Sequence, residues 1–169
     1  MNLTIRELKV TDIENFVYWF TEDREWEEWD APWANEEMEP QTIRLCFLKK
    51  VFEQRKLEKK TFMQIELDGR HIGWVNSYYL NNDENMLAIG ITIPPRDIRG
   101  KGVGKRVLTE FIGYVKEYYN GNIYCETWSG NKTMMAVAQK VGFEEFQRRR
   151  HFREVKGRLY DDVVYKLAE

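Results

Sequence analysis

Three glycines within a seven-residue segment give the first indication of chemistry. The segment runs Arg99, Gly100, Lys101, Gly102, Val103, Gly104 and Lys105. It lies between a strand pattern and a helix pattern, so its glycines allow backbone N–H groups to converge at a helix N-terminus, an arrangement that binds phosphate. A Walker A loop would need Gly at position 99 and Ser or Thr at position 106, and a dinucleotide fingerprint would need Gly at position 105. Two interpretations of the segment remain: a phosphate-binding turn of another kind, and a turn that binds no ligand.

A second chemical feature is a strongly acidic segment that also holds three tryptophans. Residues 21–40 contain nine acidic side chains and one arginine, a net charge of −8, whereas the rest of the chain carries +6. Carboxylates attract cations, and the faces of Trp26, Trp29 and Trp33 can add cation–π contacts of about 0.5 to 2 kcal/mol each. A cation-binding surface and a solvated acidic segment whose tryptophans cap the core are both compatible with this pattern.

Other kinds of chemistry find little support in the residue types. Cys46 and Cys125 are far apart and lack C-x-x-C spacing, and His71 and His151 have no nearby cluster of ligands, so we expect no metal and no disulfide. Cys125 is a possible nucleophile, but a strand cysteine without a paired histidine is more often inert core. The basic run at 148–158 alternates with apolar residues on predicted strands and predicts no nucleic-acid binding. Without an apolar run of membrane length or a signal peptide, we expect no membrane association and a cytoplasmic location.

The first half of the chain must supply two helices and four strands. Alternating apolar residues predict a strand at 3–8, and the T-x-x-E spacing of Thr11 and Glu14 predicts a capping box that starts a helix. A second helix is expected from Pro40 to about Leu57. Strands at 61–67 and 71–80 flank Asp68-Gly69, a strong hairpin signal, and a further strand is expected at 86–93.

In the second half, strand and helix patterns alternate. An apolar face with helical period begins at Gly102, a strand is expected at 122–128, and a short helix at 131–141 ends at Gly142. Strands at 144–154 and 159–167 should form a terminal hairpin. The order predicts a single mixed α/β domain over 1–169, with a central mixed sheet of about seven strands flanked by about four helices.

The glycine segment, together with a second motif, resembles the GNAT superfamily of N-acetyltransferases. The superfamily's acetyl-CoA loop reads R/Q-x-x-G-x-G/A, which Arg99, Gly102 and Gly104 match. Downstream, Asn131 and the run from Lys140 to Phe143 look like the superfamily's second motif. The order of elements also fits, and the ending at 157–165 is similar to the branch that contains ribosomal-protein N-terminal acetyltransferases.

The resemblance implies how an acetyl donor, acetyl-CoA, would bind. Backbone N–H groups of the loop from Arg99 to Lys105 would hold the CoA pyrophosphate, and the backbone at Ile91 and Ile93 would pair with the pantetheine arm, which Asn131 would also contact. A backbone amide on the strand near Ile91 to Ile93 would polarise the thioester carbonyl. The stretch 94–98 is one residue longer than in many relatives, which puts the register of the pantetheine contacts in question.

The resemblance also implies a base. An amine with a pKa of about 10.4 costs roughly 4.6 kcal/mol to deprotonate at pH 7, so a group must accept its proton. Glu126 is the candidate, because ribosomal-protein N-terminal acetyltransferases carry a glutamate at this distance before the motif asparagine. An ion pair between Glu126 and a basic neighbour is the alternative. Where the superfamily often has a tyrosine that acts as general acid and protonates the leaving thiolate, this chain has Ala138. Other tyrosines or a water could substitute, namely Tyr124, Tyr160 and Tyr165.

The resemblance implies that the acidic segment forms the acceptor side, because in this superfamily the stretch between the first two helices helps to form that side. Trp26, Trp29 and Asp30 are the expected acceptor-binding residues, and they favour a cationic amine. Polyamines, aminoglycosides and amines of basic proteins all satisfy this condition. The expected reaction is direct acetyl transfer, without a covalent enzyme intermediate. A non-catalytic acyl-CoA sensor or partner-binding module is the alternative, and a homodimer is possible.

Overall fold

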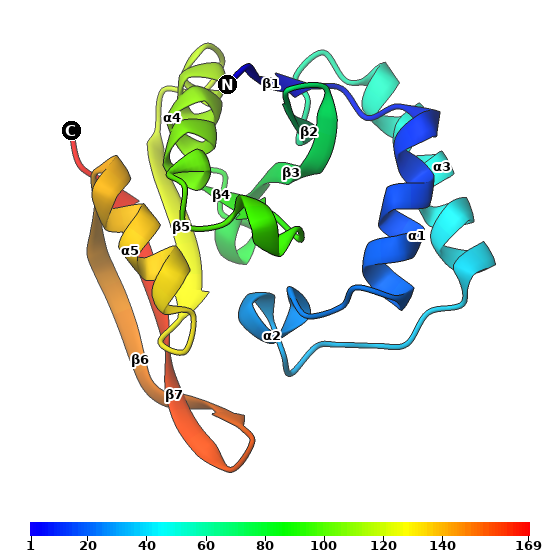
Figure 1. Ribbon diagram of the computed structural model, residues 1–169. Coiled ribbons are helices and arrows are strands. Elements are labelled where there is room, and N and C mark those ends of the chain that lie inside the picture. Colours follow the sequence, from blue (N-terminus) through cyan, green and yellow to red (C-terminus); the bar gives the residue numbers. More distant parts are fainter.

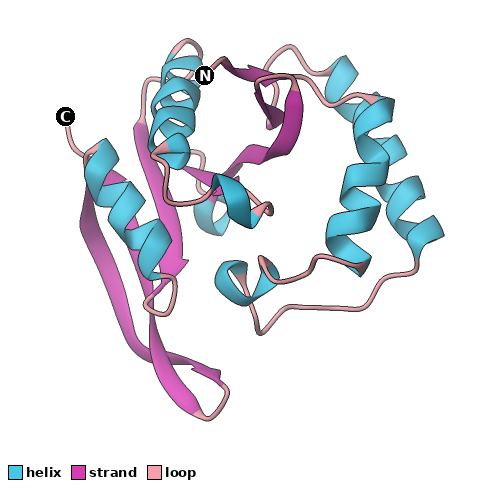
Figure 2. Ribbon diagram, in the orientation of Figure 1, coloured by secondary structure: helices cyan, strands magenta, loops and turns pink.

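The computed structural model describes residues 1–169 and contains one seven-stranded sheet, flanked by helices (Figures 1 and 2). The strand order is β1-β2-β3-β4-β5-β7-β6. The strands are β1 (Leu3–Arg6), β2 (Phe62–Leu67), β3 (Arg70–Tyr79), β4 (Met86–Thr92), β5 (Asn122–Trp128), β6 (Phe143–Val155) and β7 (Arg158–Leu167). All neighbouring pairs are antiparallel except β4 and β5, so the mixed α/β sheet predicted from the sequence is confirmed.

Two hydrophobic clusters attach the helices to the sheet. The α-helices are α1 (Ile13–Thr21), α2 (Glu27–Asp30), α3 (Pro40–Lys56), α4 (Val103–Lys116) and α5 (Lys132–Val141). One cluster packs the apolar face of α4 and Ala138 of α5 against the strands. The other packs α1 and α3, which lie side by side in Figure 1, against Phe62 and Trp74. None of these helices has the length and apolar character that would carry it across a membrane.

Local signals in the sequence explain most element boundaries. Asp68 and Gly69 both have positive φ, 49° and 79°, which the tight turn between β2 and β3 requires. Asn131 caps α5, because its side chain accepts the N–H of Met134 at 3.0 Å. The helix ends at Gly142 in the left-handed conformation, with φ of 109°.

The expected capping box at the first helix is wrong. Thr11 lies within a 3₁₀ turn, Val10–Asp12, and α1 begins only at Ile13. Asp12 directly precedes α1, but its side chain caps no N–H of that helix; its Oδ2 accepts the N–H of Lys9 at 2.8 Å and so closes the 3₁₀ turn. The same carboxylate receives two hydrogen bonds from the Arg6 guanidinium at the end of β1, at 2.8 and 2.9 Å, so an ion pair between β1 and the 3₁₀ turn helps to fix where the helix starts.

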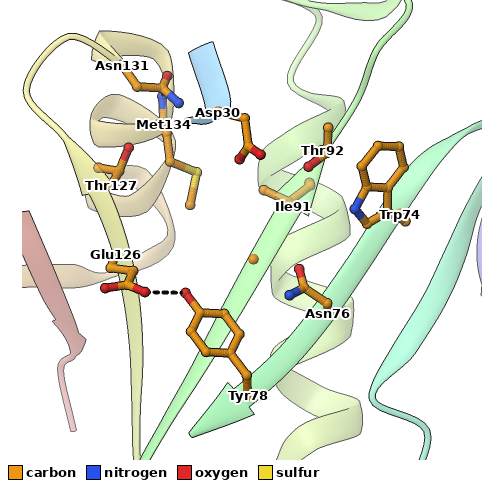
Figure 3. A pocket seen from close by; sticks show the side chains of 11 residues that line it. Asp30, Trp74, Asn76, Tyr78, Ile91, Thr92, Glu126, Thr127, Asn131 and Met134 are labelled. Carbon is orange, nitrogen blue, oxygen red and sulfur yellow. Dashed lines mark hydrogen bonds between the residues drawn. The ribbon is translucent and has the colours of Figure 1, made fainter. Parts of the chain in front are cut away.

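The sheet opens between its two parallel strands. Pairing of β4 with β5 covers only Met86–Ala88 and Asn122–Tyr124, although both strands continue beyond these residues. On its other side β4 stays paired with β3 up to Thr92, and β5 stays paired with β7 up to Trp128. The strands therefore diverge after Ala88 and leave a wedge-shaped opening, which Figure 3 shows from close by.

Candidate acetyl-transfer site

A cleft of about 210 Å³ lies in the opening between β4 and β5 (Figure 3). Five elements supply its walls: α2, β3, β4, β5 and the start of α5. The lining residues are Asp30, Trp74, Asn76, Tyr78, Gly90, Ile91, Thr92, Glu126, Thr127, Asn131 and Met134. Two carboxylates, Asp30 and Glu126, thus reach one cleft from segments almost 100 residues apart in sequence.

Glu126 projects from β5 into this cleft and meets one tyrosine there. The Tyr78 hydroxyl of β3 donates a hydrogen bond to Glu126 Oε1 at 2.8 Å (Figure 3). Burial of the phenol and the adjacent carboxylate raise the pKa of Tyr78 well above its usual range, so the phenol keeps its proton. No basic side chain pairs with Glu126 within 4 Å, so the alternative of a structural ion pair receives no support.

The open edge of β4 presents main-chain groups to the cleft. Ser77 of β3 donates its N–H to Thr61, on the β2 side, so the alternate residues of β3 bond to β4 instead. Their partners in β4 include Gly90 and Thr92. Ile91 lies between these two, and its N–H and C=O therefore point to the opposite edge, toward the gap that faces β5.

Beyond β4, the main chain at Ile93 is partly occupied. The Ile93 carbonyl accepts the Arg99 Nε–H at 3.1 Å, and Arg99 also bonds the Pro94 carbonyl. The guanidinium of Arg99 in addition binds Glu25 Oε2 at 2.7 Å. The side chain of Arg99 thus holds the chain together around the loop, and its charge is already partnered within the protein.

The glycine loop and the first turn of α4 leave backbone donors free. Gly100 and Gly102 both have φ of 76°, and no atom lies within 4 Å of where a Cβ would sit on either residue. No side chain caps α4, and its first turn contains no acidic residue. The first N–H groups of a helix have no intrahelical partner, so this turn has donors available for an anion. The residues around the loop therefore fit a CoA pyrophosphate.

Asn131 stands where the acidic segment meets β5 and α5. Its Nδ2 donates to the Trp29 carbonyl at 2.8 Å, while its Oδ1 caps α5. The Trp128 indole donates to the same Trp29 carbonyl at 2.9 Å. One end of α2 is therefore fastened to the far wall of the cleft, and the Glu25–Arg99 pair fastens its other end near the glycine loop.

The three candidate acceptor residues have different environments. Trp26 is only 7% exposed and packs against Phe20 and Trp74 in the core, outside the cleft lining. Trp29 is 42% exposed, and its indole donates to Glu25. Asp30 alone of the three lines the cleft.

Part of the charge in the acidic segment is neutralised by ion pairs within the protein. Asp23 and Glu25 pair with Arg96 or Arg99, and Glu27 pairs with Arg24. Asp30 has no such partner. Burial of its carboxyl and the nearby Glu27 raise the pKa of Asp30 above its ordinary value, although the residue stays solvent-exposed and water screens the effect.

The tyrosines that sequence reasoning offered as acids lie elsewhere. Tyr124 and Tyr165 are buried in the core, and Tyr160 packs edge-on against Trp128; none lines the cleft. Tyr78, which was not among the predicted site residues, does line the cleft. Its alternation with Trp74 and Asn76 along one strand face was the available signal.

Two other side chains capable of chemistry, Cys125 and His71, are buried away from the cleft. Burial raises the pKa of the Cys125 thiol to about 12, so it is not an activated nucleophile. His71 is buried among Asn15, Gln64 and Asp12, and no group of three or more His, Cys, Asp or Glu side chains in the structure could hold a metal ion.

Comparison with known proteins agrees with this arrangement. A family model described as an acetyltransferase (GNAT) domain matches residues 2–144. No curated protein sequence matches the chain.

Three solved structures illustrate how widely the fold recurs. RimL, a ribosomal L7/L12 α-N-protein acetyltransferase solved with coenzyme A, shares 12% identity over 98% of this chain and 93% of its own, with a TM-score of 0.80. The protein yncA from Salmonella typhimurium, solved with acetyl-CoA, shares 16% over 99% and 94%, with a TM-score of 0.77. A spermidine N-acetyltransferase SpeG chimera from Vibrio cholerae and hSSAT shares 18% over 99% and 95%, with a TM-score of 0.74.

The family model covers most of the chain, and the order of elements, the glycine loop and the divergence of β4 from β5 are in keeping with it. The chain belongs to the GNAT family of acetyltransferases, the acetyl-CoA-dependent N-acetyltransferases.

Proposed function

We propose that this protein transfers the acetyl group of acetyl-CoA directly to a primary amine of a cationic acceptor, in the cleft between β4 and β5. One observation carries the proposal: the open edge of β4 and the carboxylates of Asp30 and Glu126 face the same cleft. The main chain and the side chains thus offer two different kinds of binding group within one space.

On the donor side, the main chain would do the binding. Free N–H groups at the start of α4 would take the pyrophosphate, and the edge of β4 at Ile91 would align the pantetheine arm as an added strand. When bound, acetyl-CoA supplies an acetyl group already activated as a thioester. A main-chain N–H on this edge can donate a hydrogen bond to the carbonyl oxygen, where negative charge develops.

On the acceptor side, Glu126 would remove a proton. Its Oε1 is held by Tyr78, which leaves Oε2 to accept a proton from the amine, directly or through one water. No group in the structure activates Cys125 for a covalent route, since its thiol is buried. The residues thus support direct transfer: the amine nitrogen would bond to the acetyl carbon, the carbon–sulfur bond would break, and CoA would leave as a thiolate that takes up the second proton lost by the nitrogen.

The acceptor's charge follows from what lines the cleft. Asp30 and Glu126 are carboxylates without an ion-pair partner, and the cleft contains no Lys or Arg. A polyamine, an aminoglycoside-like amine or an amine of a basic protein matches this lining. Trp33 of the acidic segment lies outside the cleft lining, and its ring already carries the Arg153 guanidinium at 4.3 Å from the ring centroid, so we expect the carboxylates of the cleft to contribute more than this tryptophan.

Mass spectrometry of the purified protein with acetyl-CoA tests the proposal. Spermidine, kanamycin and a lysine-rich peptide represent the three classes of cationic acceptor, and glutamate and an acidic peptide serve as controls. We expect a product heavier by one acetyl group from at least one cation and none from the anions. Binding of acetyl-CoA without any product would instead favour the non-catalytic sensor.

A further inference from the structure

We propose that Tyr78 is the positioning residue of the acetyl-transfer site, holding the Glu126 carboxylate in the orientation in which its free oxygen faces the acceptor amine. The inference rests on the proposed function, in which Glu126 is the base. It adds a residue that neither of the two sequence motifs contains.

The sheet is built to let Tyr78 reach Glu126. Their strands, β3 and β5, are not neighbours, because β4 lies between them. Tyr78 pairs with Ala88 on β4, and Ala88 in turn pairs with Tyr124, two residues before Glu126. The strand positions between the two side chains are thus Ala88 and Gly90.

Small residues at those two positions leave room for the tyrosine ring to lie across β4. Gly90 in particular is already close to a neighbour, since a Cβ there would lie 2.6 Å from the Asn76 amide oxygen. A larger side chain at position 88 or 90 would stand between the phenol and the carboxylate. The hydrogen bond therefore depends on a local pattern that spans three strands.

Glu126 needs an external partner to keep one orientation. It is solvent-exposed on β5, no cation pairs with it, and a free glutamate side chain samples several rotamers. The Tyr78 bond, at 2.8 Å, restricts Oε1 and thereby directs Oε2. Because burial and the neighbouring carboxylate raise the pKa of Tyr78 above its usual range, the phenol keeps its proton and remains a donor.

Tyr78 is better suited to positioning than to acid catalysis. A phenol that holds its proton this strongly is a poor proton source for a thiolate, whose conjugate acid has a pKa of about 8.5. The missing tyrosine at Ala138 is thus not replaced by an equivalent acid at Tyr78.

The test compares Tyr78→Phe with Tyr79→Phe, two variants that each lose one hydroxyl. Tyr79 follows on the same strand, is 46% exposed, and makes no hydrogen bond to Glu126. The first readout uses no acetyl-CoA: the ¹³C NMR signal of the Glu126 carboxyl carbon in glutamate-labelled protein, identified by its absence from Glu126→Gln. The second is steady-state kinetics with the best acceptor from the mass-spectrometry panel.

We expect Tyr78→Phe to move the Glu126 carboxyl signal and to lower kcat about tenfold with little change in KM for acetyl-CoA, because one hydrogen bond to a charged group is lost. Tyr79→Phe should do neither. An unmoved carboxyl signal together with an unchanged kcat would overturn the proposal. If the carboxyl signal moves in Tyr78→Phe but the wild-type protein acetylates no acceptor, the proposed function is overturned and only the Tyr78–Glu126 contact is retained.

Discussion

The donor side and the acceptor side of the cleft are built on opposite principles. The glycine loop and the edge of β4 offer main-chain groups, held by left-handed glycines and by strand pairing. The acceptor side offers the side chains of Asp30, Tyr78 and Glu126, which come from α2, β3 and β5. A main-chain site depends on local conformation, whereas a side-chain site depends on how distant elements pack.

This difference predicts how each side responds to substitution. On the acceptor side, replacing a carboxylate by its amide keeps the shape and removes the charge, so chemistry should change and folding should not. On the donor side, loss of a left-handed glycine should matter more than loss of any single side-chain charge. The following four predictions test this contrast.

The largest effect is expected at Glu126. Glu126→Gln should lower kcat/KM about 10²- to 10⁴-fold, the usual contribution of a general base, while acetyl-CoA binding stays unchanged. Steady-state rates and calorimetric titration with acetyl-CoA measure the two quantities. Glu144→Gln on β6, an exposed glutamate outside the cleft, is the matched control and should keep full activity. A similar loss of kcat/KM in both variants would contradict the assignment of Glu126 as the general base.

The donor side should respond to a change of backbone conformation. Gly102→Val places a β-branched residue at φ of 76°, a strain of about 1 to 2 kcal/mol, and should weaken acetyl-CoA binding about tenfold. Gly113→Ala in the middle of α4 meets open space and should raise stability by about 1 kcal/mol without affecting binding. Calorimetry and thermal melting separate the two outcomes. Equal affinity for acetyl-CoA in wild type and Gly102→Val would argue against the glycine loop as the pyrophosphate-binding site.

Asp30 should show a smaller effect that depends on pH. Because its pKa is raised, Asp30 becomes protonated at a higher pH than an ordinary aspartate, and KM for a cationic acceptor should rise as pH falls through that range. Asp30→Asn should raise KM about fivefold at pH 8 and remove this pH dependence. It should also raise Tm slightly, since a carboxylate with a raised pKa destabilises the folded state above that pKa. If KM for the acceptor still depends on pH in Asp30→Asn, a group other than Asp30 causes that dependence.

The smallest effect is expected at the ion pair that joins the two sides. Glu25→Gln removes the charge that Arg99 and Arg96 share, but Trp29 still receives hydrogen bonds from Trp128 and Asn131. An ion pair this close to solvent contributes about 0 to 1 kcal/mol, so KM for the acceptor should rise no more than about threefold. Glu14→Gln, which breaks the exposed pair with Arg44 far from the cleft, is the control.

The same contrast explains what the sequence could predict. The glycine loop, the strand at 122–128 and the end of the following helix at Gly142 depend on residues adjacent in the chain, and the structure has each of these elements in place. The predicted start of α1 is wrong because the Arg6 side chain, at the end of β1, binds Asp12 in the 3₁₀ turn before the helix, which the capping-box pattern does not take into account. The four-residue helix α2 was missed, because so short a helix is stabilised by contacts such as the bonds to the Trp29 carbonyl.

Side chains of the acceptor site were harder to predict for the same reason. A tryptophan-rich acidic segment does not reveal which tryptophan turns inward, and Trp26 joins the aromatic core while Asp30 reaches the cleft. Tyr78 was missed because its significance depends on Ala88 and Gly90, small residues on a neighbouring strand. The register of three strands cannot be predicted from the sequence of any one of them.

Amide NMR of ¹⁵N-labelled protein, titrated with acetyl-CoA and then with spermidine, tests the central claim that donor and acceptor meet where β4 and β5 diverge. We expect acetyl-CoA to move the amide signals of residues 99–105 and of Ile91, and spermidine to move those around Asp30 and Glu126. Signals of the paired segment Met86–Ala88 should hardly change. Shifts confined to the far end of the sheet, around Glu144 and Lys166, would contradict the account.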